Sequence, residues 1–259
     1  MTIEQALTVF VEGFTFTRSL THPYLSERRN ENLWRLSDAP RRRASDSYRG
    51  EEWIAWELPP AVVDAQARAT AQSKFTICYL VPLGESDSEA RAAFKALGYR
   101  LMSTEPLMVH DLTTLPALPH SERFPIVRVQ TPAQADALAK AARRKMLLPE
   151  HLITEPPPLR LYLAQDEAVP QVIGWVGSAA TSEGTWVTSL FVEKAYRRQG
   201  VGRDLMAQML TDDKASGAPA SVLLASHTGA LLYPTLGYQQ LGTLYLYTPP
   251  KARMSSLQS

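Results

Sequence analysis

The segment from Ser189 to Arg203 constrains the fold of this chain more than any other. An apolar run ends at Val192, a basic turn follows, and Gly200 and Gly202 open an amphipathic helix. The first backbone N–H groups of a helix have no intrahelical partner, and the helix dipole favours negative charge there. Glycine leaves room for a bulky anion. The segment therefore predicts a phosphate-binding loop in an α/β domain, with charge added by its arginines: Arg197, Arg198 and Arg203.

Three other kinds of loop also contain paired glycines: a tight turn, a dinucleotide-binding loop and a P-loop. A tight turn that needs glycine for its backbone geometry alone stays open. A dinucleotide-binding loop needs Gly-x-Gly-x-x-Gly, and Leu205 stands where the third glycine belongs. A P-loop needs Lys followed by Ser or Thr, and the segment has no such pair.

A stretch rich in proline and polar residues, 113–125, divides the chain. Such a stretch continues neither a helix nor a central strand. We therefore expect an N-terminal lobe over 1–115, a linker over 116–125, a C-terminal domain over 126–250 and a polar tail over 251–259.

Hydrophobic patterning after the linker predicts alternating strands and helices. The clearest helix start is Thr131, Pro132 and Gln134, a capping signal with proline at the first helical position. The expected order is typical of an α/β fold, a mixed sheet with helices on both faces. The expected strands are 126–129, 159–164, 172–179, 186–192, 221–225 and 241–247, and the expected later helices are 200–211 and 228–236.

The N-terminal half carries a weaker copy of the same ending. Residues 94–99 (Phe-Lys-Ala-Leu-Gly-Tyr) align with residues 233–238 (Tyr-Pro-Thr-Leu-Gly-Tyr). In both hexapeptides a short helix is expected to stop at a glycine in the left-handed conformation. Strands expected at 75–81 and 107–109, with a helix over 88–97 between them, favour an internal duplication.

The run from Leu190 to Gly202, with its Arg-x-x-Gly-x-Gly, resembles the pyrophosphate-binding signature of the GNAT acetyltransferase superfamily. Residues 230–238 are similar to the second signature of that family, a helix with Leu-Tyr that closes at glycine and an aromatic residue. The resemblance covers 126–249 and implies a mostly antiparallel sheet with a splayed strand pair, in two tandem copies. It also implies acetyl-coenzyme A as the cofactor, bound by Leu190, Phe191, Val192, Arg197, Arg198, Gln199, Gly200, Val201, Gly202, Arg203 and His227.

The activity that the resemblance implies is N-acetyltransfer, by direct attack of an amine acceptor on the thioester in a ternary complex. Tyr233 falls at the position of the family's general acid. A phenol with a pKa near 10 can protonate a thiolate and stays neutral at working pH. A core aromatic is the other interpretation of Tyr233. Phe94 stands at the equivalent place in the first copy, which also lacks an Arg-x-x-Gly-x-Gly, so that copy is expected to be catalytically silent.

Two positions depart from the family pattern. His227 stands where Asn is common; an imidazole can still donate a hydrogen bond, and a satisfied surface histidine is the other interpretation. Thr188 and Ser189 occupy the stretch where many members carry a carboxylate base, so the base is unassigned. This departure motivates an alternative hypothesis, a non-catalytic acyl-CoA-binding sensor. The length of the acyl chain is also open.

The family's acceptor site corresponds to residues 142–158 here. This stretch carries both signs of charge, which would suit many amines, from a peptide N-terminus to a small metabolite. The ionisable residues are Arg143, Arg144, Lys145, Glu150, His151 and Glu155.

Composition excludes several other classes. The formal net charge is +1, so no overall field recruits nucleic acid or an anionic membrane. Cys78, the single cysteine, lies in an apolar run and is expected to be a buried core residue. Neither this cysteine nor the scattered histidines predict a metal site. No membrane span or signal peptide is expected, and a cytoplasmic location follows by default.

Overall fold

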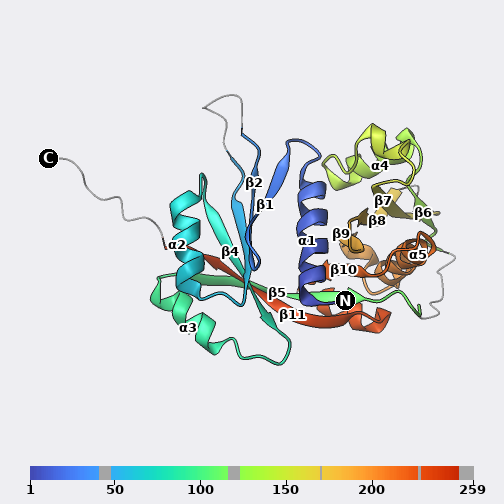
Figure 1. Ribbon diagram of the computed structural model, residues 1–259. Coiled ribbons are helices and arrows are strands. Elements are labelled where there is room, and N and C mark those ends of the chain that lie inside the picture. The colour runs from blue at the N-terminus through green and yellow to red at the C-terminus, as the bar shows by residue number, and fades with distance from the viewer. Residues whose placement is uncertain (41–47, 116–122, 170, 227–228, 251–259) are drawn as a thin grey trace. The chain divides into compact units, whose positions relative to one another are not determined.

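The computed structural model describes residues 1–40, 48–115, 123–169, 171–226 and 229–250 (Figure 1). These residues form two compact units, each built from two stretches of chain. We call Met1–Tyr24 with Pro106–Leu241 the cradle unit, and Leu25–Glu105 with the chain from Gly242 the companion unit.

The cradle unit contains a mixed sheet in the order β5-β10-β9-β8-β7-β6. Pairing is antiparallel except between β9 and β10, which are parallel. Its strands are the end of β5 (Arg100–His110), β6 (Ile126–Arg128), β7 (Leu159–Asp166), β8 (Gln171–Ala180), β9 (Thr185–Val192) and β10 (Ser221–Leu224). Its helices are α1 (Ile3–Arg18), α4 (Pro132–Ala142) and α5 (Val201–Ala215), with 3-10 turns at Pro149–Leu152, Lys194–Tyr196, Gly229–Leu231 and Tyr233–Leu236.

The companion unit has its own strand order, β1-β2-β3-β4-β11. Here β3 and β4 are parallel, and β4 and β11 are antiparallel. The strands are β1 (Tyr24–Asn30), β2 (Leu33–Asp38), β3 (Glu51–Trp56), β4 (Phe75–Pro82) and most of β11 (Gln239–Thr248), and the helices are α2 (Pro60–Thr70) and α3 (Ser88–Ala96). Cys78 lies on β4 with 3% of its surface exposed, as predicted, and burial raises the pKa of its thiol.

The duplication is visible in the order of elements. The series β3, α2, β4, α3, β5 repeats as β9, α5, β10, a 3-10 turn and β11. The two hexapeptides end alike, because Gly98 and Gly237 both have positive φ, +84° and +94°. In each copy the following tyrosine N–H donates to the carbonyl five residues back, that of Phe94 or Tyr233. The mixed α/β fold and the tandem repeat are therefore as the sequence predicted.

The unit boundaries differ from those expected from the linker. The last strand of each half pairs in the unit of the other half: the end of β5 pairs with β10, and β11 pairs with β4. Ladder hydrogen bonds join residues far apart in sequence, so the polar stretch 113–125 does not separate the two units. Of that stretch, 116–122 lie outside the described residues.

Helix α1 is an element of the cradle unit that the sequence analysis did not predict (Figure 1). Thr2 and Gln5 form a capping box at its start. It packs so closely on β9 that a Cβ atom on Gly13 would lie 2.1 Å from Cβ of Trp186. At its middle, Glu12 accepts hydrogen bonds of 2.8 Å from both the N–H and the hydroxyl of Ser182.

Helices cover both faces of the cradle sheet, as predicted. Ser178 on β8 donates to Asp213 of α5 at 2.7 Å, so alternate residues of β8 face α5. Its neighbour Ala179 pairs with Trp186, which contacts α1 on the other face. The Asp213 carboxylate is fully buried and also accepts from Arg160, at 2.6 Å, and from Thr185. This network ties α5 to three strands.

Most predicted elements of the C-terminal half are present within a few residues of their expected ends. The Thr131–Gln134 capping box of α4 is formed as expected. The exception is the helix expected over 228–236, which consists of two 3-10 turns in its described part. Pro234 lacks a backbone donor and Gly229 is a poor helix former, so a continuous α-helix is not favoured there.

Candidate active site

Two parallel strands of the cradle unit separate near their ends. Strands β9 and β10 pair at Thr185–Ser221 and at Trp186–Val222, and then diverge while β9 continues to Val192. The corresponding strands of the companion unit, β3 and β4, stay in register over their whole common length, from Glu51–Phe75 to Trp56–Leu80. The splayed pair predicted from the sequence is therefore present in the cradle unit, and the companion pair is closed. A closed pair has no free strand edge between its members; the expected catalytic silence of the first copy stays a prediction.

A β-bulge lies where β9 leaves β10. The register of β9 against β8 shifts between Trp175 and Gly177, and Ser189 takes a left-handed φ of +60°. Gly174 permits the close approach on the β8 side, since a Cβ atom there would lie 2.8 Å from the carbonyl oxygen of Phe191. Bulges re-aim side chains, and a left-handed non-glycine residue costs about 1–2 kcal/mol. Strain of this kind concentrates at functional sites.

The three apolar residues predicted along the splayed strand point to both faces. Leu190 and Val192 pack against the hydrophobic core that contains the buried residues of α5, which we call the α5 core (Val201, Leu205, Met206, Met209 and Leu210 with their neighbours). Phe191 stacks on Trp175 instead, with ring centroids 4.4 Å apart and planes at 24°. All three are half-buried.

The predicted phosphate loop connects β9 to α5. Arg198 and Gly200 both have positive φ, +63° and +89°, and the helix begins at Val201. Within the described residues, no hydrogen-bond acceptor faces the backbone N–H groups of 198–203. Unpaired N–H groups at the start of a helix, here one of fifteen residues, are donors of the kind that can bind an anion.

Two side chains predicted to bind the cofactor instead donate hydrogen bonds to backbone carbonyls of this loop and the preceding strand. The Arg197 Nε donates to the carbonyl of Val192, and the Gln199 Nε2 donates to the carbonyl of Ala195, each at 2.9 Å. Arg198 is exposed, whereas Nε of Arg203 is buried without a partner among the described residues. The loop geometry therefore depends on Arg197 and Gln199, and Arg198 and Arg203 retain donors for an anion.

The two glycines of the loop differ in why they are needed. Gly200 has a left-handed φ, so its requirement is conformational. Gly202 is helical, and a Cβ atom there would lie 3.6 Å from Leu232 and from Val192, an ordinary contact. Neither the backbone nor packing explains glycine at 202. A simple turn therefore accounts for Gly200 and leaves Gly202 without an explanation.

Tyr233 lies at the start of the last 3-10 turn, beside the α5 core. Its surface is 7% exposed, and its ring meets that of Tyr238 edge-on at 5.7 Å. No described residue pairs with its hydroxyl, and a Cβ atom on Gly229 would lie 2.9 Å from the ring, so glycine leaves the space that the ring fills. Burial raises the pKa of Tyr233 to about 12 and keeps the phenol protonated. The residue is both a core aromatic and a protonated donor.

The splayed strand, the loop and the turn before Tyr233 meet at Gly202, where a Cβ atom would lie 3.6 Å from both Val192 and Leu232. His227 lies outside the described residues. At the bulge, Thr188 and Ser189 present hydroxyl groups, 3.1 Å apart, in place of the carboxylate that many family members carry there. A contact that the sequence analysis missed occurs here: Arg144 Nη2 donates to the Ser189 hydroxyl at 2.7 Å. No spacing signal links residues 45 positions apart.

Two histidines of the cradle unit are engaged structurally. His151 is buried against Phe16 of α1, its Nδ1 accepts from the Leu148 N–H, and burial lowers its pKa. The neutral ring therefore carries its proton on Nε2 and offers no free lone pair for a base. His110 accepts from the Leu112 N–H and donates to the Leu236 carbonyl, so both of its nitrogens are also occupied.

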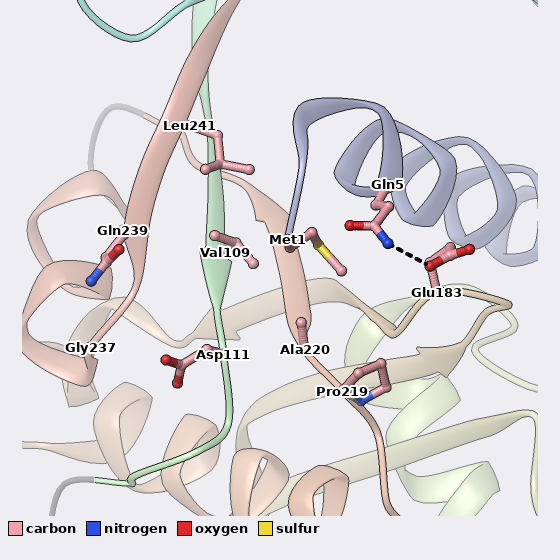
Figure 2. Close-up of a pocket in the computed structure, with 10 residues that line it drawn as sticks. All are labelled: Met1, Gln5, Val109, Asp111, Glu183, Pro219, Ala220, Gly237, Gln239 and Leu241. Atoms are coloured by element: carbon pink, nitrogen blue, oxygen red, sulfur yellow. Dashed lines mark hydrogen bonds between the residues drawn. The ribbon is translucent and has the colours of Figure 1, made fainter.

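A separate cavity of about 440 Å³ lies at the other end of the same sheet (Figure 2). Its lining includes Pro219 and Ala220, which precede β10, together with Glu183, to which the Gln5 amide donates at 3.2 Å. Because the strands split at the far end of β10, this cavity contains none of the predicted site residues.

Neither a metal cluster nor a membrane-spanning helix is present among the described residues. The described residues hold no cluster of three or more histidine, cysteine or carboxylate side chains suited to a metal ion. None of the helices in the described ranges combines the length and apolarity that crossing a membrane requires.

A splayed parallel strand pair followed by a glycine loop and a helix defines the fold class of the GNAT acyltransferases. Residues 157–240, about a third of the chain, match the model of the acetyltransferase (GNAT) domain. No curated protein is a significant match to the sequence. This match supports acyl transfer to an amine as the general activity.

Solved structures support the same fold. A GCN5-related N-acetyltransferase from Kribbella flavida is 15% identical, aligns over 100% of both chains and has a TM-score of 0.62. A second GCN5-related N-acetyltransferase, from Sphaerobacter thermophilus, is 18% identical over 83% of this chain and 78% of that chain, with a TM-score of 0.55. A tandem GNAT protein from the clavulanic acid biosynthesis pathway is 14% identical over 84% of this chain and 78% of that chain, with a TM-score of 0.55. At these identities the likeness concerns the fold.

Proposed function

We propose that the cradle unit is an acetyl-CoA-dependent N-acetyltransferase that transfers an acetyl group to an amine by direct attack in a ternary complex. The observation that carries the proposal is the conjunction of a split strand pair with the unpaired N–H row at 198–203. The diphosphate of coenzyme A would lie on this row, beside Gly202 and the donors of Arg198 and Arg203. The pantetheine arm would pair with the free edge of β9 along 190–192, as an added strand does.

Acetyl transfer forms one C–N bond and breaks one C–S bond. The acceptor nitrogen attacks the thioester carbonyl carbon, a C–N bond forms, and the C–S bond breaks. The departing sulfur takes the proton of the Tyr233 hydroxyl, and the proton lost by the amine returns to Tyr233 through solvent. A backbone N–H of the splayed strand, that of Val192, would stabilise the carbonyl oxygen as negative charge develops.

The position of Tyr233 suits this role. Its ring packs in the α5 core. The Trp175–Phe191 stack instead joins β8 to β9. The Arg144–Ser189 contact joins the segment after α4 to β9. The phenol is neutral at physiological pH even at an ordinary pKa near 10, burial raises this pKa further, and its hydroxyl is not already used by a described residue. It therefore has a proton available for the thiolate, while the amine would approach from the side of the bulge.

Calorimetry with coenzyme A and a thiol-release assay with acetyl-CoA and an amine panel test the proposal together. Binding with amine-dependent thiol release is expected. Absence of coenzyme A binding would refute both the site and the activity.

A second candidate, a non-catalytic acyl-CoA sensor, is favoured by one observation, the lack of a described carboxylate at the bulge. The same two assays separate it from the enzyme. A sensor would bind coenzyme A and release no thiol with any amine.

A further inference from the structure

We propose that the acceptor of this site is an amine that also carries a carboxylate, and that Arg144 is the residue that recognises it. The inference rests on the proposed function, since it concerns the substrate class of that same site. It starts from the contact between Arg144 and Ser189.

The position of this contact in the sheet relates it to the reacting groups. Strand β9 pairs with β10 as far as Trp186, and Ser189 lies three residues further, in the bulge. An amine that attacks a thioester held between the two strands must pass the polar side chains nearest to the split. On β9 these are the hydroxyls of Thr188 and Ser189, 3.1 Å apart. The Arg144 guanidinium is therefore at the expected approach of the acceptor.

The charge at this point is not neutralised. Arg144 is exposed, and within the described ranges its hydrogen-bond partner is a neutral hydroxyl, with no carboxylate in an ion pair with it. Arg143 and Lys145, its neighbours in the chain, are also exposed. A guanidinium presents a planar fork of donors that matches a carboxylate in two parallel hydrogen bonds. One Nη atom on Ser189 leaves the remaining donors for such a ligand.

A purely structural role for Arg144, as a cation at the end of α4, explains fewer of these observations than acceptor recognition does. A cation near the C-terminal end of α4 interacts favourably with the helix dipole, and Lys140 in the last turn already provides this interaction. The Arg144 side chain instead reaches across to β9, 45 residues later in the chain. Ser189 keeps a left-handed backbone that a glycine would adopt without strain, and its hydroxyl is the group that holds the guanidinium. Both features are explained if the pair positions a donor for the acceptor.

The test uses matched amines, free amino acids and the corresponding amino-acid amides, in the thiol-release assay with acetyl-CoA. The wild-type protein should prefer the free acids, by at least about tenfold in kcat/KM. Arg144→Ala should abolish that preference through KM, with little change in kcat. Arg144→Lys should keep part of it, because a point charge replaces the fork. Lys140→Ala, an equal loss of charge in the last turn of α4, shortly before Arg144, should leave it unchanged.

A binding arm keeps the proposal testable without turnover. Protein saturated with coenzyme A is titrated calorimetrically with N-acetyl amino acids and with their amides. The carboxylates should bind about tenfold more tightly, and Arg144→Ala should remove the difference. Equal binding of acids and amides, no binding of either, or an equal effect of Arg144→Ala on both would overturn the inference. If coenzyme A itself does not bind, the proposed function fails; if it binds and the acids are not preferred, only the acceptor class fails.

Discussion

Replacing Tyr233 by phenylalanine separates catalysis from stability more cleanly than any other single change. The hydroxyl has no partner among the described residues, and the ring fills a core position with 7% exposure. Phenylalanine keeps the ring and removes a poorly solvated polar group, so the free energy of unfolding should change by less than about 1 kcal/mol, or increase slightly. Coenzyme A affinity should be unchanged, because the proposed contacts lie on β9 and the loop.

Turnover should fall strongly in the same variant. A positioned general acid contributes about 10²–10⁴ in rate, which equals about 3–5 kcal/mol of transition-state stabilisation at 1.36 kcal/mol per factor of ten. The assay is thiol release at saturating acetyl-CoA, with coenzyme A affinity measured by calorimetry. Unchanged turnover with a demonstrated acceptor would remove Tyr233 from the mechanism.

Tyr238 offers a matched control. It is also a buried tyrosine, but its hydroxyl is hydrogen-bonded to the Ser221 hydroxyl at 2.8 Å. Tyr238→Phe leaves a buried hydroxyl without its partner and should cost about 1–3 kcal/mol of stability with turnover retained. The two variants should therefore show opposite patterns. If Tyr238→Phe lost turnover as strongly as Tyr233→Phe, a general disturbance of the core would explain both.

The raised pKa of Tyr233 also predicts a pH dependence of stability. Burial raises its pKa from 10.0 to about 12, so the folded state holds this proton more tightly than the unfolded state does. The contribution is fully present below pH 10 and is lost as the pH rises from about 10 to 12. Alkaline unfolding followed by circular dichroism should show a shallower loss in this window for Tyr233→Phe than for the wild type.

Three further changes test other parts of the structure. Gly202→Val should weaken coenzyme A binding at least tenfold by excluding the phosphate, and unchanged affinity in calorimetry would contradict the loop assignment. Gly13→Val should destabilise the cradle unit by about 1–3 kcal/mol in urea unfolding, because the site of the new Cβ lies 2.1 Å from Trp186; an unaffected midpoint would mean that α1 does not pack there. Arg160→Ala should cost about 3 kcal/mol at pH 7 by leaving the Asp213 carboxylate buried without its cation. That loss should shrink as the pH falls and the carboxylate is protonated, whereas a loss that did not depend on pH would point to packing alone.

Local signals predicted much of the C-terminal half. The Thr131–Gln134 cap, the glycines that end the two hexapeptides and the apolar runs of β7 to β9 are set by residues close in sequence. Turn and cap preferences act over a few residues, so they can be read without knowing the rest of the molecule. The loop at 197–203 belongs to the same group, because unpaired donors follow from the start of a helix wherever that helix lies. The sequence by itself therefore determined the fold class and where an anion is expected to bind.

Only the tertiary structure decided the composition of the units and the surroundings of the site. Strand exchange between β5 and β11, and the packing of α1 on Trp186, depend on ladder hydrogen bonds and close contacts between residues more than a hundred positions apart. The Arg144–Ser189 contact is of the same kind. The split between β9 and β10, and its absence between β3 and β4, follow from the registers of both strand pairs in the folded chain. Such contacts leave no periodic mark in the chain, because each depends on how distant segments meet in three dimensions.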